Sequence, residues 1–270
     1  MKCSGPPPNL PLGQPLAAIR WPIGLQGSPT AVRLGLDGCR GGWVLARLAA
    51  RRLVLSLLPG LKSLEMGDQH MGCVDMPIGL TSHGQPRCCD DRVRRLLAPA
   101  GRSSSVFSPP GRCCLSLSDH GLATAAQRSG GGPGLSIQSW HLLERIRELD
   151  DWLQAQPQRP RQLLECHPEL TFLQLQQRHQ PEWPAPVSKH RDSGQHQRLR
   201  LLCQHWGWDP TGLVDQALVR SHRRHLQHHD LVDALACLAV AMDGQRQTLP
   251  IFPATDAAGL PMAVTCLGPG

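Results

Sequence analysis

The chain has 270 residues, of which 40% are hydrophobic, and its formal net charge at pH 7 is +7 with the histidines counted as neutral. This length accommodates one large domain, or one domain with an appendage. No apolar run approaches the roughly 20 residues of a membrane-spanning helix, and the first residues lack the apolar core of a secretory signal, so we expect a cytoplasmic protein without membrane contact.

The net charge and the number of cysteines indicate which partners and which redox compartment to expect. A basic balance favours a polyanionic partner such as nucleic acid, although ordinary solvated surface charge gives the same sum. The chain has 11 cysteines, an odd number, and no C-x-x-C pair. We therefore expect reduced thiols that pack as small hydrophobes, and neither a disulfide framework nor a zinc ribbon.

Residues 1–31 are rich in Pro and Gly and lack periodicity, which predicts a poorly ordered extension before a single domain over residues 32–270. Strands are predicted, in chain order, at 32–37, 43–49, 53–58, 71–76 and 162–166, with a possible short one at 261–267. Helices are predicted at 86–97, 137–154, 195–206 and 229–242, with another beginning within 170–175. Residues 99–136 and 178–194 are predicted loops. A three-strand meander followed by strands that alternate with helices indicates an α/β fold with a mixed sheet.

Five acidic residues stand where apolar surroundings are expected. Asp37, Asp75 and Glu165 lie at the ends of predicted strands, while Asp230 and Asp233 lie on an apolar helix. Each has an ordinary explanation taken singly: a turn, a helix cap or an arginine partner. If the strands are neighbours, however, the carboxylates converge, and such a cluster repels itself unless cations lie within it. Mg²⁺ and Mn²⁺ prefer oxygen ligands, and two of them about 3.5–4 Å apart can stabilise both oxygens of a phosphodiester displacement.

Several motifs follow one another along the chain and resemble a known family. They are Gly35–Trp43, Val74–Leu80, Cys89-Asp90, Arg94–Leu97, Arg102–Phe107, Gly134–Ser136, Gln138–Trp140, Glu165–Glu169, Ser188-Lys189 and Asp230–Ala234. In type and order they resemble the DUF429 family, predicted nucleases of the ribonuclease H-like fold, over residues 32–267. Asp233-Ala234-Leu235 also resembles the last helix of RuvC-type resolvases. Asp91 departs from the family, which usually has arginine there.

The resemblance implies a ribonuclease H-like mixed five-stranded sheet flanked by helices, with a loop-rich insertion. Its first strand is central, and acids lie on adjacent strands and on the last helix. The expected cofactor is Mg²⁺ or Mn²⁺ in a two-metal site. Asp37 is expected to bind both ions, Asp75 and Glu165 one each, and Asp233 completes the set with Asp230 nearby. The candidates for binding phosphate or substrate are Arg40, Arg102, Ser104, His167 and Lys189.

Three functions compete at this point. The first is a metal-dependent nuclease that acts on DNA or RNA through an activated water. The second is a nucleic-acid-binding protein that keeps the fold without catalysis. The third is a phosphoryl transferase of the actin/hexokinase type, which needs two Asp-Gly hairpin domains and a longer chain. A dinucleotide-binding loop is excluded, because the glycines after Asp37 lack the required spacing and the following helix.

Overall fold

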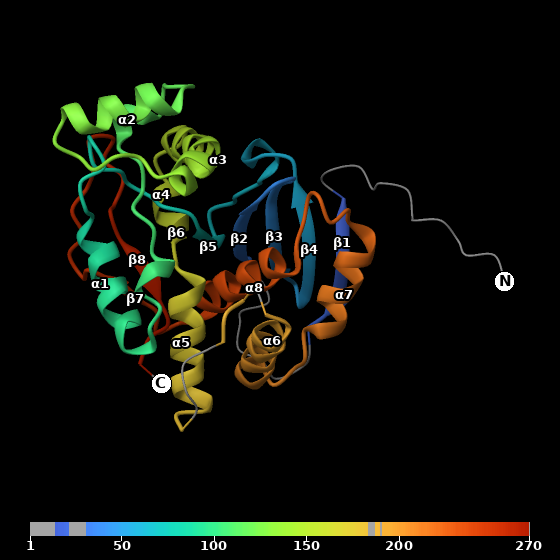
Figure 1. The fold of residues 1–270 in the computed structure, drawn as a ribbon. Helices are drawn as coiled ribbons and strands as arrows, with labels where there is room; N and C mark the ends of the chain where they lie inside the picture. The colour runs from blue at the N-terminus through green and yellow to red at the C-terminus, as the bar shows by residue number, and fades with distance from the viewer. Residues whose placement is uncertain (1–13, 22–30, 183–186, 190, 270) are drawn as a thin grey trace.

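The computed structural model describes residues 14–21, 31–182, 187–189 and 191–269, and a six-stranded mixed sheet forms its centre (Figure 1). The strands are β1 (Pro15–Arg20), β2 (Arg33–Cys39), β3 (Gly42–Ala49), β4 (Arg52–Leu58), β5 (Met71–Asp75) and β6 (Leu163–Glu165). Their order across the sheet is β1-β4-β3-β2-β5-β6. The predicted meander is β2-β3-β4, while β5 runs parallel to β2 and β6 parallel to β5. The predicted mixed sheet is confirmed, but it has six strands where five are expected.

Helices flank this sheet, as expected. They are α1 (Cys88–Leu97), α2 (His120–Ser129), α3 (Ile137–Gln154), α4 (Arg159–Gln162), α5 (Pro168–His179), α6 (Asp192–Trp206), α7 (Thr211–Arg220) and α8 (His228–Met242). Short 3-10 turns occur at Leu61–Ser63, Ala98–Ala100, Ser103–Ser105 and Arg112–Cys114. A separate two-stranded sheet of β7 (Gln247–Leu249) and β8 (Val264–Cys266) lies beside α1 (Figure 1).

The core has two layers, because side chains alternate between the faces of each strand. On β3, Val44 and Ala46 pack in a cluster with residues of α6, α7 and α8. Trp43 and Leu45 point the other way and pack in a cluster with residues of α3. The sheet is therefore covered by α8 and its neighbours on one face and by α3 on the other.

Helix α8 lies unusually close to the sheet at β2. A Cβ placed on Gly35 would come within 2.1 Å of the Ala234 carbonyl oxygen and 2.3 Å of the Leu238 amide nitrogen, so only glycine permits this approach. The α8 helix is apolar all round, and residues Leu231–Ala241 are buried. The close packing places the N-terminal part of α8 beside the end of β2.

The fold differs from the sequence prediction at several elements, since α4, α7 and β7 form where no helix or strand is predicted. Pro15–Arg20, within the predicted extension, forms edge strand β1 and pairs antiparallel with β4. It is anchored by buried Leu16 and by Trp21, whose ring lies 5.3 Å from that of Trp206. The rest of the predicted extension, 1–13 and 22–30, lies outside the described residues, apart from Ala31. Within the predicted loop 99–136, α2 forms a helix that the glycine-rich flank concealed, and its N-cap is Asp119.

Two further features of the described residues concern membrane-spanning helices and the state of the cysteines. Within those ranges, no helix is both long and apolar enough to cross a membrane. Each cysteine that the structure describes is a free thiol, and most of these are buried.

Candidate functional site

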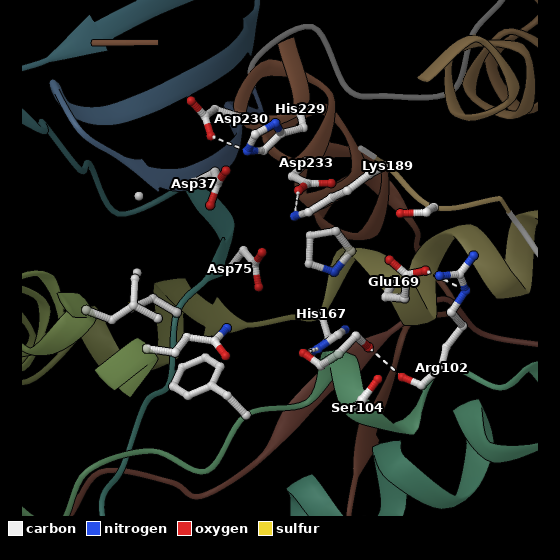
Figure 2. A pocket seen from close by; sticks show the side chains of 18 residues that line it. Asp37, Asp75, Arg102, Ser104, His167, Glu169, Lys189, His229, Asp230 and Asp233 are labelled. Carbon is white, nitrogen blue, oxygen red and sulfur yellow. Dashed lines mark hydrogen bonds and ion pairs between the residues drawn. The ribbon is translucent and has the colours of Figure 1, made fainter. Parts of the chain in front are cut away.

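A cavity of about 420 Å³ opens where β2 and β5 end against the first turns of α8. Figure 2 shows Asp37, Asp75 and Asp233 directed toward the same space, with His167 and Ser104 on the opposite wall. We call it the acid cavity. Its charged lining residues are Asp37, Asp75, Arg102, Glu169, Lys189, Asp230 and Asp233.

The two strands of the site are held in register by the sheet. Asp37 is directly paired with Asp75 in the parallel ladder between β2 and β5. Alternation sends Asp37 to the same face as Gly35, and Asp75 to the same face as Cys73, which is the face that α8 covers. Within the described part of the chain, neither carboxylate accepts a hydrogen bond. Two acids of adjacent strands thus face the helix without a hydrogen-bond partner among the described residues.

Helix α8 supplies two further carboxylates from positions three residues apart. Asp230 caps the start of the helix, since its Oδ2 accepts a 2.7 Å hydrogen bond from the Gln227 amide. Asp233 Oδ2 accepts a 2.6 Å bond from Lys189 Nζ, and its Oδ1 lies 3.5 Å from Arg198 Nη1. That second oxygen is buried and has no hydrogen-bond partner among the described residues. Asp233 is therefore ion-paired through both oxygens, but only Oδ2 accepts a hydrogen bond from a described residue.

Crowding perturbs the acids on the strands. Burial, followed by the carboxylates of Asp75 and Asp233, raises the pKa of Asp37 well above its ordinary range. Burial and Asp233 raise the pKa of Asp75 to about 7. Burial likewise raises the pKa of Asp230 to about 6. Burial is the first cause of each shift and neighbouring carboxylates add to it, while Lys189 opposes it.

Asp233 behaves in the opposite way. Burial favours its neutral form, but the cations of Lys189 and Arg198 outweigh burial and hold the pKa of Asp233 below its ordinary range. The Lys189 ammonium is stabilised in turn by Asp233 and Asp75, which raise its pKa although burial lowers it. Lys189 and Arg198 therefore outweigh burial at Asp233, whereas Lys189 offsets burial only in part at Asp37, Asp75 and Asp230.

Glu165 does not line the acid cavity. Alternation on β6 places it with Leu163 on the face covered by α3, the opposite face from Asp37 and Asp75. There its Oε1 accepts a 2.6 Å bond from Arg87 Nη2, and its Oε2 accepts one of 2.7 Å from the Ile78 amide. Arg87 also pairs with Asp90. This placement differs from the expected metal ligand and agrees with the alternative of an arginine partner.

Another acid of the same motif occupies the cavity. Glu169, in the first turn of α5, lines it and accepts a 2.6 Å bond from Arg198 Nη2. Arg102 Nε lies 3.7 Å from its other oxygen. Sequence reasoning missed Glu169 and the buried Arg198 as site residues. The only available signal was the four-residue spacing between Glu165 and Glu169, which does not say which acid faces the site.

The candidate phosphate ligands divide between two cavities. Arg102, Ser104, His167 and Lys189 line the acid cavity (Figure 2). Arg40 lines a neighbouring cavity instead. The structure thus brings four of the five predicted residues together in the acid cavity, and Arg40 lines the adjoining cavity.

His167 is held in one tautomer by its surroundings. Its Nε2 lies 3.3 Å from the Ser105 carbonyl oxygen, which can only accept, so Nε2 carries the proton. Its Nδ1 is buried and has no hydrogen-bond partner among the described residues. Burial lowers the pKa of His167, which favours the neutral ring. His167 is therefore a neutral ring whose Nδ1 carries a lone pair and can accept a hydrogen bond or a proton.

The acids suit a hard divalent cation in their chemistry. Their donors are carboxylate oxygens, and one of these, Asp233 Oδ1, is buried without a hydrogen bond. As they stand, the described residues include no group of three or more His, Cys, Asp or Glu side chains arranged to hold a metal ion.

Comparison with known proteins identifies the family. A family model described as "Protein of unknown function (DUF429)" matches residues 35–257, which include every acid of the cavity. No curated protein matches the chain. No solved structure matches it either. Because the match spans most of the sequence, the chain belongs to the DUF429 family.

Proposed function

We propose that the protein is a metal-dependent phosphodiester hydrolase of the ribonuclease H-like fold that cleaves nucleic acid. One observation carries the proposal: Asp37, Asp75, Asp230 and Asp233 come from two adjacent strands and one helix to line a single cavity. Burial and mutual repulsion disfavour the ionised forms of these carboxylates. Divalent cations bound between them would stabilise those forms, which gives the cluster a functional explanation.

The topology supports the fold assignment. The first strand of the meander, β2, lies inside the sheet, with its antiparallel partner on one side and parallel β5 on the other. Acids end β2 and β5, and further acids start the buried helix α8. This is the arrangement that the family resemblance implies.

Asp37, Asp75 and Asp233 would hold Mg²⁺ or Mn²⁺, with Asp230 beside them. Bound there, the ions would lower the pKa of a water molecule and offset the charge that develops on a phosphodiester. Glu165 has no part in this set, because Arg87 and the Ile78 amide occupy both its oxygens on the other face of the sheet.

The remaining lining residues would act on the substrate. Lys189 and Arg102 carry positive charge at the cavity wall and would bind phosphate oxygens. Ser104 can donate a hydrogen bond to the same group. The lone pair on His167 Nδ1, which has no hydrogen-bond partner among the described residues, would accept a proton from the attacking water or orient it.

Cleavage of labelled oligonucleotides tests the proposal. The full chain is incubated with single- and double-stranded DNA and RNA in Mg²⁺ or Mn²⁺, with EDTA as the metal-free reference. We expect metal-dependent cleavage, and Asp75→Asn to reduce it on the order of a hundredfold or more, since a ligand supplies several kcal/mol of stabilisation. Asp68→Asn, an exposed acid that precedes β5 at the end away from Asp75, should leave cleavage unchanged.

Binding without cleavage under every condition would refute the hydrolase and leave the non-catalytic nucleic-acid-binding protein. Metal binding has its own readout. Mn²⁺ titrated into the wild-type chain and followed by electron paramagnetic resonance should lose affinity in Asp75→Asn and keep it in Asp68→Asn. Equal affinity in all three proteins would contradict the proposed ligand set.

A further inference from the structure

A second cavity, of about 510 Å³, adjoins the acid cavity. The two cavities share Gly38, Leu142, His229 and Asp230 in their linings, so they adjoin at the end of β2. We call the second one the basic annex. Its basic lining residues are Arg40, His141, Arg145, Arg223, His225 and His229.

The annex is assembled from three separate parts of the chain. Arg40 lies in the β2–β3 turn, Arg223 and His225 in the α7–α8 connection, and Arg145 on α3. The first two parts are joined through Gly41, whose amide donates a 2.9 Å hydrogen bond to the His225 carbonyl. A Cβ on Gly41 would lie 2.8 Å from the His225 Cβ, so glycine lets the two loops meet.

The third part is fixed by a network beneath it. Arg145 Nη1 donates a 3.0 Å hydrogen bond to Glu148 Oε2, which also accepts one of 2.8 Å from Trp43 Nε1. Glu148 Oε1 accepts a bond from the Leu61 amide. Because Trp43 is fully buried, this network anchors the Arg145 side of the annex to the core. The annex is therefore a built feature of the fold.

Charge separates the two cavities. In the acid cavity the carboxylates outnumber the Lys and Arg side chains, whereas in the annex Arg outnumbers the two acids, Glu144 and Asp230. Neither Arg40 nor Arg223 forms a salt bridge with another described residue, and both are exposed. Their guanidinium groups are free to bind an oxyanion, and their planar forks match phosphate. The positive end of the α8 dipole lies at the junction and adds to this field.

We propose that the basic annex binds a backbone phosphate of the same nucleic acid strand whose reacting phosphodiester lies in the acid cavity. The inference rests on the proposed function and specifies its substrate: a polynucleotide that spans both cavities, in preference to a mononucleotide or small phosphate ester. The shared lining residues place the two cavities side by side, and the two exposed arginines provide the second contact point.

Binding as a function of substrate length tests the annex. Full-length Asp37→Asn protein, chosen to bind without turnover, is titrated in Mg²⁺ with a fluorescent dinucleotide and with an oligonucleotide of about twelve nucleotides, within the usual range of single-strand site sizes. Arg40→Gln/Arg223→Gln is added to this background. The matched control is Arg47→Gln/Arg52→Gln, which removes the same charge from exposed positions near the opposite end of the sheet.

We expect the annex double variant to bind the longer strand at least about tenfold more weakly and to reduce the salt dependence of log K by about 0.7, the value for one lost phosphate contact on a single strand. Dinucleotide binding should change much less, and the control pair should bind both ligands as the parent does. Equal losses for both lengths, or equal losses in the annex and control variants, would overturn the inference. Hydrolysis of bis-p-nitrophenyl phosphate by the wild-type chain tests the proposed function separately, since that diester is too small to reach the annex.

Discussion

At the scale of single residues, the acids of the cavity are costly to keep ionised. The pKa of Asp75 is raised to about 7 by burial and by Asp233, and that of Asp230 to about 6 by burial. A carboxyl whose pKa is higher in the folded than in the unfolded chain binds its proton more tightly in the folded state. Its contribution to stability is therefore most favourable below the unfolded pKa and is lost as the pH rises through the folded pKa.

Asp75→Asn should consequently stabilise the metal-free protein, and only above acidic pH. In EDTA we expect the variant and the wild type to differ little near pH 4, and the variant to gain on the order of 2 kcal/mol by pH 8, with the change between about pH 4 and 7. Urea unfolding across that range measures it, with Asp68→Asn as the control. A stability difference that does not vary with pH would argue against crowding of the acids.

Glu165 binds Arg87 and the Ile78 amide on the other face of the sheet. Its substitution distinguishes a role as an arginine partner from a role as a metal ligand. Glu165→Gln leaves the buried Arg87 cation paired with Asp90 alone, and the lost charge-assisted hydrogen bonds should cost about 2 kcal/mol in unfolding free energy. The loss should be the same with and without Mn²⁺. Glu65→Gln, at an exposed position, is the control. A loss seen only in the presence of Mn²⁺ would restore Glu165 as a metal ligand.

At the scale of elements, the contact between β2 and α8 positions the site. The contact depends on Gly35, because the atoms that a Cβ would meet there belong to the α8 backbone and cannot rotate away. The same contact brings Asp233 beside Asp37, two residues farther along β2. Sheet and helix together thus set the spacing of the acids.

Gly35→Ala should therefore be severely destabilising, by about 3 kcal/mol or more, because overpacking cannot be relieved by a rotamer change. Gly212→Ala is the matched control, since a Cβ added there would meet no atom within 4 Å and alanine favours the α7 helix. Thermal unfolding should show a large fall for the first variant and a slight rise for the second. If both variants unfold at similar temperatures, the close approach does not hold the site together.

At the scale of the whole molecule, the described N-terminal segment is part of the domain. Edge strand β1 completes the sheet, and Trp21 lies with Trp206 and Trp208 in an aromatic cluster beside α6. The Trp21 amide also donates a 2.7 Å hydrogen bond to the Arg51 carbonyl. These contacts join the segment before β2 to the helices on the α8 side of the sheet.

Trp21→Ala should cost about 3–5 kcal/mol, the range for truncating a buried aromatic side chain. Trp21→Phe should cost clearly less, since the indole nitrogen is buried without a hydrogen-bond partner among the described residues and its loss removes no bond. Urea unfolding of the two variants compares them directly. An alanine variant as stable as the wild type would mean that β1 is peripheral to the fold.

Local sequence patterns predicted much of the fold, because alternation and helical periodicity follow from the geometry of a single strand or helix. Alternation and apolar runs placed β2 to β6 within a few residues, and helical periodicity placed Ile137–Gln154 at its observed ends. Strand β1 was missed because its few apolar residues lie among prolines and glycines, and pairing with β4 outweighs that weak local preference.

The sequence by itself determined that carboxylates end apolar strands and lie on a buried helix, and it placed Asp37, Asp75 and Asp233 among the candidates. Which of these acids share a face was decided only by the tertiary structure. Alternation relates residues within one strand, but the register between strands decides which face each set occupies, and β6 turns Glu165 away while α5 brings Glu169 in. The pairing of Lys189 and Arg198 with Asp233, and the meeting of three distant segments in the basic annex, likewise arise from contacts between parts of the chain that no local pattern relates.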